Sequence, residues 1–382
     1  MGDTAVWFLL SLYLNEALGY SEVELGTVIF LMSAFSVLPL LPAGYISDRF
    51  GRRRMIFIGI GVSVLGMALL IRANVLTEFY LGASVWGFGH SLYMPSYMGF
   101  LSEKVEEHRR KYLFSFQMFS GMIASASATF VFGFMPASLS RFLDTTLQGG
   151  YRVTFLIGTW FLLAQLSPLI LTKREIKKEE KSSIFPTQIK KFAPLPKITL
   201  VKLCIPMALL GLGAGLVVPF FQVYFQWRFN TSVEDIGILF SFTQFLWAAA
   251  YLLMPNLAER KGSVGAITAV HTAAIIALVA IPISPNFFFV AIAYITRMVL
   301  MNSTWPIFQS YSLSQVPKEH RSLTISSTNF SFNGTRAITP IIAGYLFEWS
   351  LEVPFFLTAI LYAIATITFY SFFKKSDDRR AI

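Results

Sequence analysis

Charged side chains are scarce in this sequence. Asp, Glu, Lys and Arg make up 14% of its 382 residues, whereas soluble globular chains carry about 25%. Hydrophobic residues account for 55% of the chain, which includes 38 phenylalanines, and the mean hydropathy is +0.60. This composition excludes a soluble globular domain and predicts a membrane protein with several spans.

Cysteine and histidine are also rare. The single cysteine, Cys204, excludes a disulfide framework and a thiolate metal cluster. The four histidines, at 90, 108, 271 and 320, have no metal-ligand spacing, so we expect neither a metal nor a cofactor. No G-x-x-x-x-G-K-[ST] loop indicates an ATP motor, and no convergent catalytic set indicates an enzyme. We therefore assign no catalytic residue.

Long apolar runs recur along the whole chain. A run of about 18 residues or more crosses a bilayer as a helix, so the sequence predicts an all-α fold of twelve transmembrane helices. The expected spans are 1–18, 23–46, 55–73, 79–102, 113–138, 152–172, 203–227, 234–257, 264–283, 286–314, 323–348 and 352–373.

Basic residues predict the orientation of these spans. Cytoplasmic loops retain Lys and Arg, and 25 of the 31 Lys and Arg residues lie in alternate connections. We expect these connections and both termini to be cytoplasmic, in the cell membrane. The net charge of +10 then faces the anionic leaflet, and no nucleic-acid partner is expected. The basic connections are 48–54, 103–112, 173–202, 259–262, 315–322 and 374–382.

The connection at 173–202 divides the chain. It is charged, contains three prolines and has no long apolar run, so we expect a cytoplasmic linker, part of which lies on the membrane surface as an amphipathic helix. A six-helix bundle at 1–172 precedes it. A second bundle at 203–382, with a short basic cytoplasmic tail, follows it, and we expect the protein to be a monomer.

An internal repeat relates the two bundles. Three separated matches at nearly one offset indicate two six-span halves in the same orientation, and transporters with a site between such halves are known. The matches are LGYSEVELGTVIF (18–30) with FNTSVEDIGILF (229–240) and DRFG (48–51) with ERKG (259–262), both at an offset of 211, and EEHR (106–109) with KEHR (318–321) at 212.

The repeat also bears on the first span. The seventh span begins near Lys202, and subtracting the offset gives a position about nine residues before Met1. We therefore expect the first helix to lack its opening turns, which would place Asp3 near the middle of the bilayer.

The loop after the second span carries the most specific motif. GYISDRFGRR (44–53) resembles the signature loop of the major facilitator superfamily, G-x-x-x-D-R-x-G-R-R. The resemblance extends over the twelve spans and the long central linker, and it implies a secondary transporter that works by alternating access. It implies a cytoplasmic latch between the halves made by Gly44, Asp48, Arg49, Gly51, Arg52, Arg53 and Glu103.

The residue types suit such a latch. The Asp48 carboxylate can accept hydrogen bonds from the exposed N–H groups that begin a neighbouring helix, which the resemblance implies is the eleventh, near Ser322. Arg52 would pair with Glu103 at the end of the fourth span. The arginines also fix topology. The second copy keeps Glu259, Arg260 and Gly262 without the arginine pair.

Intramembrane arginines are candidates for substrate binding. The resemblance implies that spans one, four, seven and ten line the cavity, and Arg297 lies near mid-depth of the tenth span. Arg336 is similarly deep in the eleventh, with Asn302 and Asn333 nearby in sequence. A buried arginine is costly without water, an anion or a partner. This cluster predicts an anion- or hydroxyl-binding site, and the alternative is a structural brace.

Few titratable groups are placed for proton coupling. Asp3 is the only acid expected near mid-depth, where it would form a protonation-sensitive pair with Arg297 across the cavity. His90 in the fourth span titrates in the useful range, although a lone helix histidine is more often a packing residue. H⁺ is therefore a candidate partner beside the small-molecule substrate and the lipid bilayer.

Aromatic and amide side chains predict a stacking wall for a sugar ring or an aromatic drug. Packing is the alternative, since aromatics are 16% of the chain. The candidates are Trp7, Trp86, Tyr93, Gln222, Tyr224, Gln244, Trp247 and Trp305.

Several functions agree with this sequence. We favour a transporter of a small organic solute, and the abundant aromatics favour proton-coupled efflux of amphipathic compounds. Uptake of a sugar or an anionic metabolite, which the buried arginines favour, is the alternative. A membrane sensor and an intramembrane enzyme remain as alternatives of other classes.

Overall fold

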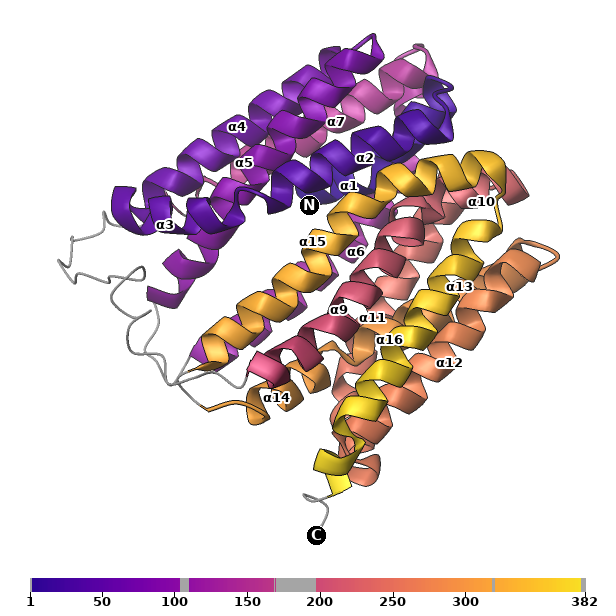
Figure 1. Cartoon of the computed structure of the whole chain (residues 1–382). Helices are drawn as coiled ribbons and strands as arrows, with labels where there is room; N and C mark the ends of the chain where they lie inside the picture. Colours follow the sequence, from indigo (N-terminus) through magenta and orange to yellow (C-terminus); the bar gives the residue numbers. More distant parts are fainter. Residues whose placement is uncertain (1, 104–109, 168, 170–196, 318–319, 379–382) are drawn as a thin grey trace.

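A computed structural model describes residues 2–103, 110–167, 169, 197–317 and 320–378. Over these residues the chain forms helices and no strand, arranged in twelve consecutive segments (Figure 1). Six of the described helices are long and apolar enough to cross a membrane on length and composition alone. The prediction of an all-α fold with twelve helical segments is confirmed.

The first half contains six of these segments. Its helices are α1 (Gly2–Leu12) continued by the π-helical η1 (Tyr13–Ala17), α2 (Glu22–Val37) followed by α3 (Leu40–Phe50), α4 (Arg52–Arg72), α5 (Leu76–Glu103), α6 (Arg110–Phe142) and α7 (Leu147–Ala164).

The second half repeats this plan. Its helices are α9 (Lys197–Val217), the 3₁₀ turn η4 (Val218–Phe220) and α10 (Phe221–Phe229), then α11 (Val233–Lys261), α12 (Ser263–Ile283), α13 (Phe287–Ser303) with α14 (Trp305–Ser314), α15 (Arg321–Trp349) and α16 (Val353–Asp378).

The matched residues of the repeat have structural roles. Ser21 accepts a hydrogen bond from the Glu24 amide, and Glu24 bonds back to the Ser21 amide, which caps α2. Ser232 accepts in the same way from the Asp235 amide at the start of α11. The repeated Ser-x-x-acid pattern is therefore a helix start, used once in each half.

Proline positions explain three breaks that the twelve predicted spans did not include. Pro39 separates α2 from α3, Pro219 lies in η4, and Pro306 follows the junction of α13 and α14. A proline lacks the N–H that would continue the helix hydrogen bonding. The seventh span consequently starts again after η4 as a short helix, α10.

The two halves approach each other through glycines. α2 packs against α15, and α6 packs against α11. A Cβ on Gly133 of α6 would lie 3.0 Å from the Cα of Gly237 on α11, and one on Gly26 of α2 would lie 3.1 Å from the Cα of Gly344 on α15. Gly26 and Gly237 are equivalent in the repeat, as are Gly133 and Gly344, so the two crossings are related by the same pseudo-symmetry.

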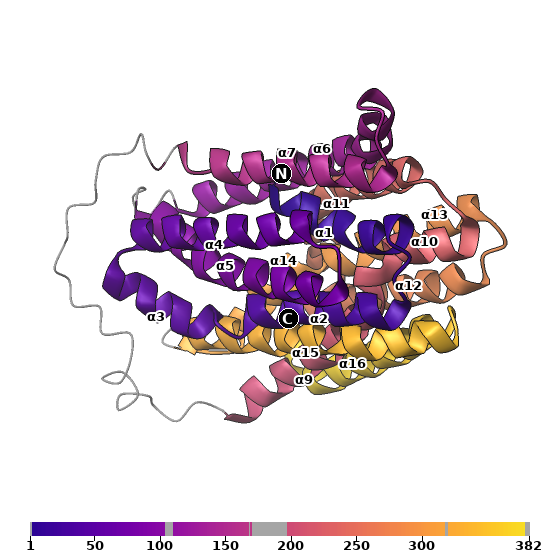
Figure 2. The same cartoon turned by 90° about the horizontal axis from the view of Figure 1, so that it is seen from above.

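These crossings lie at one end of the molecule. In Figure 1, α2 and α15 meet near the turn that follows η1 and near α10, and α15 diverges from α3 towards the opposite end. Viewed from above, α2 and α15 run side by side (Figure 2). The close contacts therefore lie away from the end that carries Gly51 and the arginines of α4.

Candidate central cavity

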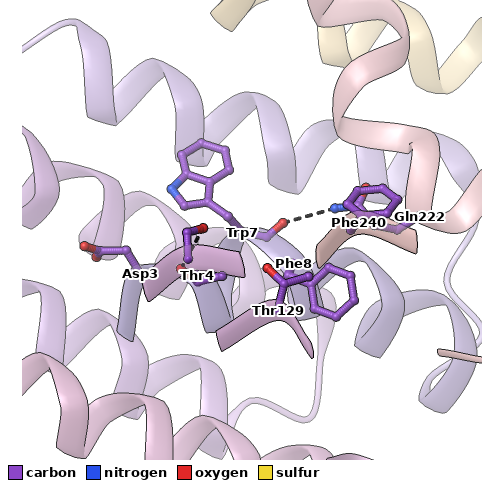
Figure 3. A pocket seen from close by; sticks show the side chains of 8 residues that line it. Asp3, Thr4, Trp7, Phe8, Thr129, Gln222 and Phe240 are labelled. Carbon is purple, nitrogen blue, oxygen red and sulfur yellow. Dashed lines mark hydrogen bonds between the residues drawn. The ribbon is translucent and has the colours of Figure 1, made fainter. Parts of the chain in front are cut away.

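A cavity of about 320 Å³ lies between the halves. The first half contributes α1 and α6 to its wall, and the second half contributes α10 and α11. In Figure 3, Asp3 lies at one end of the labelled residues, and Gln222 and Phe240 lie at the other. The lining residues are Asp3, Thr4, Trp7, Phe8, Ser125, Thr129, Gln222 and Phe240.

A second cavity of about 220 Å³ adjoins the first. Trp7, Gln222 and Phe240 line both, so the two are neighbouring lobes of one interface between the halves. The second lobe is mainly apolar, and Ser11 and Arg336 are the polar residues found in it alone. Its other lining residues are Val6, Leu10, Ile29, Met32, Val218 and Pro219.

The break in the seventh span positions Gln222. Pro219 lies in the 3₁₀ turn and lines the second lobe, so the chain restarts as α10 with Gln222 in its first turn. The Gln222 side-chain N–H group donates to the Trp7 carbonyl at 3.3 Å, which joins the two halves (Figure 3). The Gln222 Oε1 atom is buried and accepts no hydrogen bond from any described residue.

Asp3 faces the first lobe from α1. The Tyr93 hydroxyl on α5 donates a hydrogen bond to one carboxylate oxygen, while the other, Oδ1, is buried with no partner among the described residues. His90 lies one turn from Tyr93, with ring centroids 5.3 Å apart, and stacks on Trp86 at 5.4 Å. Trp86 in turn packs edge-on against Trp7 at 5.8 Å.

Asp3, His90 and Tyr93 therefore form one partly buried cluster beside the cavity. The His90 Nδ1 atom has no hydrogen-bond partner in the described part of the chain. Asp3 on α1 and His90 on α5 thus belong to one cluster. The sequence predicted each of them as a candidate, but it did not predict that they lie together.

Arg297 lies outside both lobes. Its side chain is 2% exposed, donates to the Tyr362 hydroxyl at 2.8 Å and to the Met298 sulfur at 2.7 Å, and stands over the Phe221 ring at 5.4 Å. The expected pair with Asp3 is not formed, because Arg297 points into the second bundle. Its contacts match the structural brace that was the alternative.

Arg336 is the arginine that reaches the cavity. It lines the second lobe, and its guanidinium group makes no hydrogen bond or ion pair with any residue that the structure describes. A cation that lacks an acidic partner among the described residues therefore borders an apolar lobe.

The predicted wall is only partly assembled. Trp7 and Gln222 line both lobes, and Gln244 reaches the first through a hydrogen bond to Thr129 of 3.1 Å. Tyr224 instead packs on Phe355 within the second bundle, with ring centroids 4.5 Å apart.

The remaining candidates do not line either lobe. Trp305 packs edge-on against Phe332 at 5.4 Å, and Trp247 packs against Tyr251 at 6.0 Å. Asn302 and Asn333 donate their side-chain amides to carbonyls one turn earlier in their own helices. Five residues that line the first lobe were not predicted from the sequence and carry no signal there apart from their helix positions: Thr4, Phe8, Ser125, Thr129 and Phe240.

The family model of the Major Facilitator Superfamily matches residues 1–338. The chain belongs to the Major Facilitator Superfamily.

Curated relatives match over part of their length. The uncharacterized MFS-type transporter YqjV of Bacillus subtilis (strain 168) is 33% identical over 106 residues, which cover 28% of this chain and 26% of the relative. An uncharacterized transporter of Buchnera aphidicola subsp. Schizaphis graminum (strain Sg) is 22% identical over 182 residues, or 47% of this chain and 43% of that protein. The chain thus spans less than half the length of each relative.

Solved structures share the superfamily fold over nearly the whole chain. A mutant of the nucleoside transporter NupG superposes with a TM-score of 0.78 at 14% identity and covers 97% of this chain and 96% of its own. An inward-facing, unoccupied bacterial homologue of the human lysosomal transporter Spinster superposes with a TM-score of 0.76 at 13% identity, over 97% of this chain and 92% of that chain. An inward-facing bacterial homologue of the iron transporter ferroportin superposes with a TM-score of 0.70 at 12% identity, over 97% of this chain and 94% of that chain.

The superfamily loop joins α3 to α4. Gly51 ends α3 with φ of 96°, a conformation that favours glycine, and Gly262 makes the equivalent turn between α11 and α12 with φ of 74°. Gly44, Asp48 and Arg49 lie on α3. The surroundings of these residues and of Glu103 lie outside the described part of the structure, so the predicted latch stays a prediction. Arg53 stands 6.0 Å from the centre of the Phe57 ring. Residues 173–196 of the predicted linker also lie outside the described residues.

Proposed function

We propose that this transporter moves a small organic solute by alternating access, with the two-lobed cavity as its substrate site. The observation that carries the proposal is that both halves supply the wall, with Trp7 from one half and Gln222 and Phe240 from the other. A site between two rigid bundles is exposed to one side or the other when the bundles rock.

The conformation fits an inward-facing state. The glycine crossings and the bond between Asn15 and Gln226 hold the halves together at the end opposite the basic connections. If those connections are cytoplasmic, as Lys and Arg in short loops favour, the molecule is sealed on the outer side of the cell membrane, and both termini are cytoplasmic. Two similar structures are themselves inward-facing.

We further propose that Asp3 carries the coupling proton, with His90 and Tyr93 as its neighbours. A carboxylate beside the substrate changes its charge when it binds a proton, and that change alters its affinity for a cationic group. Efflux of amphipathic compounds in exchange for H⁺ uses this linkage directly, since substrate and proton compete for the same oxygen atoms.

Proteoliposomes loaded with purified protein test the transport proposal. An imposed pH gradient should drive accumulation or extrusion of amphipathic dyes, and collapse of the gradient by a protonophore should stop it. Vesicles that stay inert with every solute would favour a sensor or an enzyme instead.

Uptake of a sugar or an anionic metabolite is the second candidate. The unpaired Arg336 in the second lobe favours it, because a guanidinium group without an acidic partner binds carboxylate and phosphate well. Saturable uptake of an organic anion, lost on Arg336→Gln, would support this alternative over efflux of cations.

A further inference from the structure

Four polar groups around the cavity lack partners, and their chemistry differs between the two lobes. Two of them are acceptors, Asp3 Oδ1 in the first lobe and Gln222 Oε1 on a residue that lines both lobes, and both are buried and without a donor among the described residues. In the second lobe are the hydroxyl group of Ser11, which is equally unpartnered, and the guanidinium group of Arg336.

Buried polar groups without a partner are costly, so such groups commonly mark the place of a ligand or water. The Asp3 carboxylate oxygen in the first lobe requires a donor, and a carboxylate favours a cation. The donors of the second lobe require acceptors, and a guanidinium favours an anion. The polar groups therefore call for opposite charges in the two lobes.

The region where the lobes meet is mainly aromatic, with Gln222 as the polar residue that lines both lobes. Trp7 and Phe240 line both lobes, and the aromatic Phe8 packs on Phe240 with ring centroids 5.8 Å apart. Asp3 and Ser11 are eight residues apart on one continuous helical segment, which separates their Cα atoms by about 12 Å along the axis. A ligand that reaches both ends needs an apolar body between its charged groups.

We propose that the substrate is a zwitterionic amphiphile, with a basic amine at Asp3, an acidic group at Arg336 and an apolar body beside Trp7 and Phe240. The inference rests on the proposed function, in that it names the class of solute for the same cavity. It accounts for the unpaired guanidinium group and the unpaired carboxylate oxygen together, whereas a cation or an anion alone satisfies only one of them.

Thermal unfolding of the purified protein in detergent tests the charge pattern. Three probes share an apolar body: 8-aminooctanoate, octylamine and octanoate. The fourth probe, β-alanine, is a zwitterion whose charged groups lie close together on a short chain without an apolar body. We expect 8-aminooctanoate to raise the unfolding temperature most and to bind about tenfold more tightly than either singly charged probe. β-Alanine should have little effect.

Two variants separate the ends of the site. Asp3→Asn should remove the advantage of 8-aminooctanoate over octanoate, and Arg336→Gln should remove its advantage over octylamine, about tenfold in each case. If Arg336→Gln folds poorly, Arg336→Lys serves as a second variant. It keeps the positive charge and should retain most of the preference for 8-aminooctanoate. Arg297→Gln is the matched control, because Arg297 is a buried arginine of the same half that lines neither lobe.

The inference is wrong if a singly charged probe binds as tightly as 8-aminooctanoate, if each variant weakens all probes equally, or if no probe changes the unfolding temperature at millimolar concentration. Gradient-driven transport in proteoliposomes tests the proposed transport function separately from the substrate class. Transport of octylamine or octanoate without preference for the zwitterion would keep the transporter and overturn the substrate class. Vesicles inert to all four probes and to amphipathic dyes would count against both.

Discussion

Asn15 donates a hydrogen bond of 3.2 Å to Gln226, which lies 211 residues later in the chain. Because 211 is also the offset of the internal repeat, these two amides occupy equivalent positions in the two halves. Their bond therefore crosses the pseudo-symmetry axis. The Trp227 indole N–H group donates a second bond, of 2.8 Å, to the side-chain Oδ1 atom of Asn15, so one asparagine side chain holds both halves together.

Asn15→Leu should favour opening of the molecule at this end. It removes two hydrogen bonds, each worth about 1 kcal/mol, so the ratio of open to closed states should rise about tenfold or more. A cysteine at Thr129, in a Cys204→Ser background, should then react faster with a membrane-impermeant maleimide added from this side. Asn286→Leu is the control, because Asn286 caps α13 within one half. Equal labelling in both variants would contradict the assignment of this seal.

The crossing of Gly133 and Gly237 should also be sensitive to size. A leucine at Gly133 cannot fit against the Cα of Gly237, since even a Cβ would lie 3.0 Å from it, so the helices must separate at this end. We expect Gly133→Leu to shift the maleimide reaction in the same direction as Asn15→Leu and to slow transport.

Gly121 provides the matched control for this substitution. It lies on the same helix, α6, and a Cβ built on it meets nothing within 4 Å. Gly121→Leu should leave both labelling and transport close to those of the unmodified protein. Similar losses in the two variants would indicate a general effect on helix packing.

Asp3→Asn should separate transport from the proton gradient. The amide cannot take up a proton, so gradient-driven accumulation should fall to background, while exchange of substrate across the membrane without a gradient continues at a measurable rate. Tyr93→Phe removes only the hydrogen bond to Asp3 and should lower the driven rate severalfold. Driven transport that survives Asp3→Asn would exclude this carboxylate as the proton carrier.

Arg297 should matter for stability more than for binding. Replacement by alanine removes its bonds to Tyr362 and Met298 and its contact with Phe221 and leaves a large cavity, which should cost about 3 kcal/mol. Thermal unfolding should show the loss, whereas substrate affinity of the folded fraction stays unchanged. Tyr362→Phe should cost about 1.5 kcal/mol. A selective loss of affinity in the alanine variant would return Arg297 to the substrate site.

The superfamily loop yields a kinetic prediction. If Asp48 forms the expected latch between the halves, Asp48→Asn should lower the transport rate while expression and membrane insertion stay near normal, because that latch would have to form again in each cycle. Arg54→Gln is the control, because Arg54 follows the last residue of the motif and its side chain is exposed on α4. Unchanged transport kinetics in Asp48→Asn would remove the latch hypothesis.

Much of the fold could be predicted because a bilayer imposes a simple pattern. Every span needs a long apolar run, and basic loops separate the runs, so the twelve segments were found to within a few residues except where proline intervenes. Pro39, Pro219 and Pro306 could have been read as breaks. Proline within membrane helices is common enough, however, that its position alone does not predict a second helix.

The site was less predictable because it depends on which way each side chain points. Arg297 and Arg336 are both deep arginines of the second half, and only packing decides that the first bonds Tyr362 while the second lines a lobe. Asp3 was found as a lone acid, but its contact with Tyr93 depends on how α1 lies against α5. Thr129 and Phe240 enter the wall because the glycine crossings bring α6 and α11 close.

The short helix α10 has a mechanical consequence. It carries Gln222, which meets Trp7 in the cavity, and Gln226 and Trp227, which hold Asn15. These contacts lie on a nine-residue rod that a proline-containing turn separates from α9. In the proposed transport cycle, a solute that displaces Gln222 from Trp7 would therefore shift the same helix that carries Gln226 and Trp227, and so would loosen their contacts with Asn15.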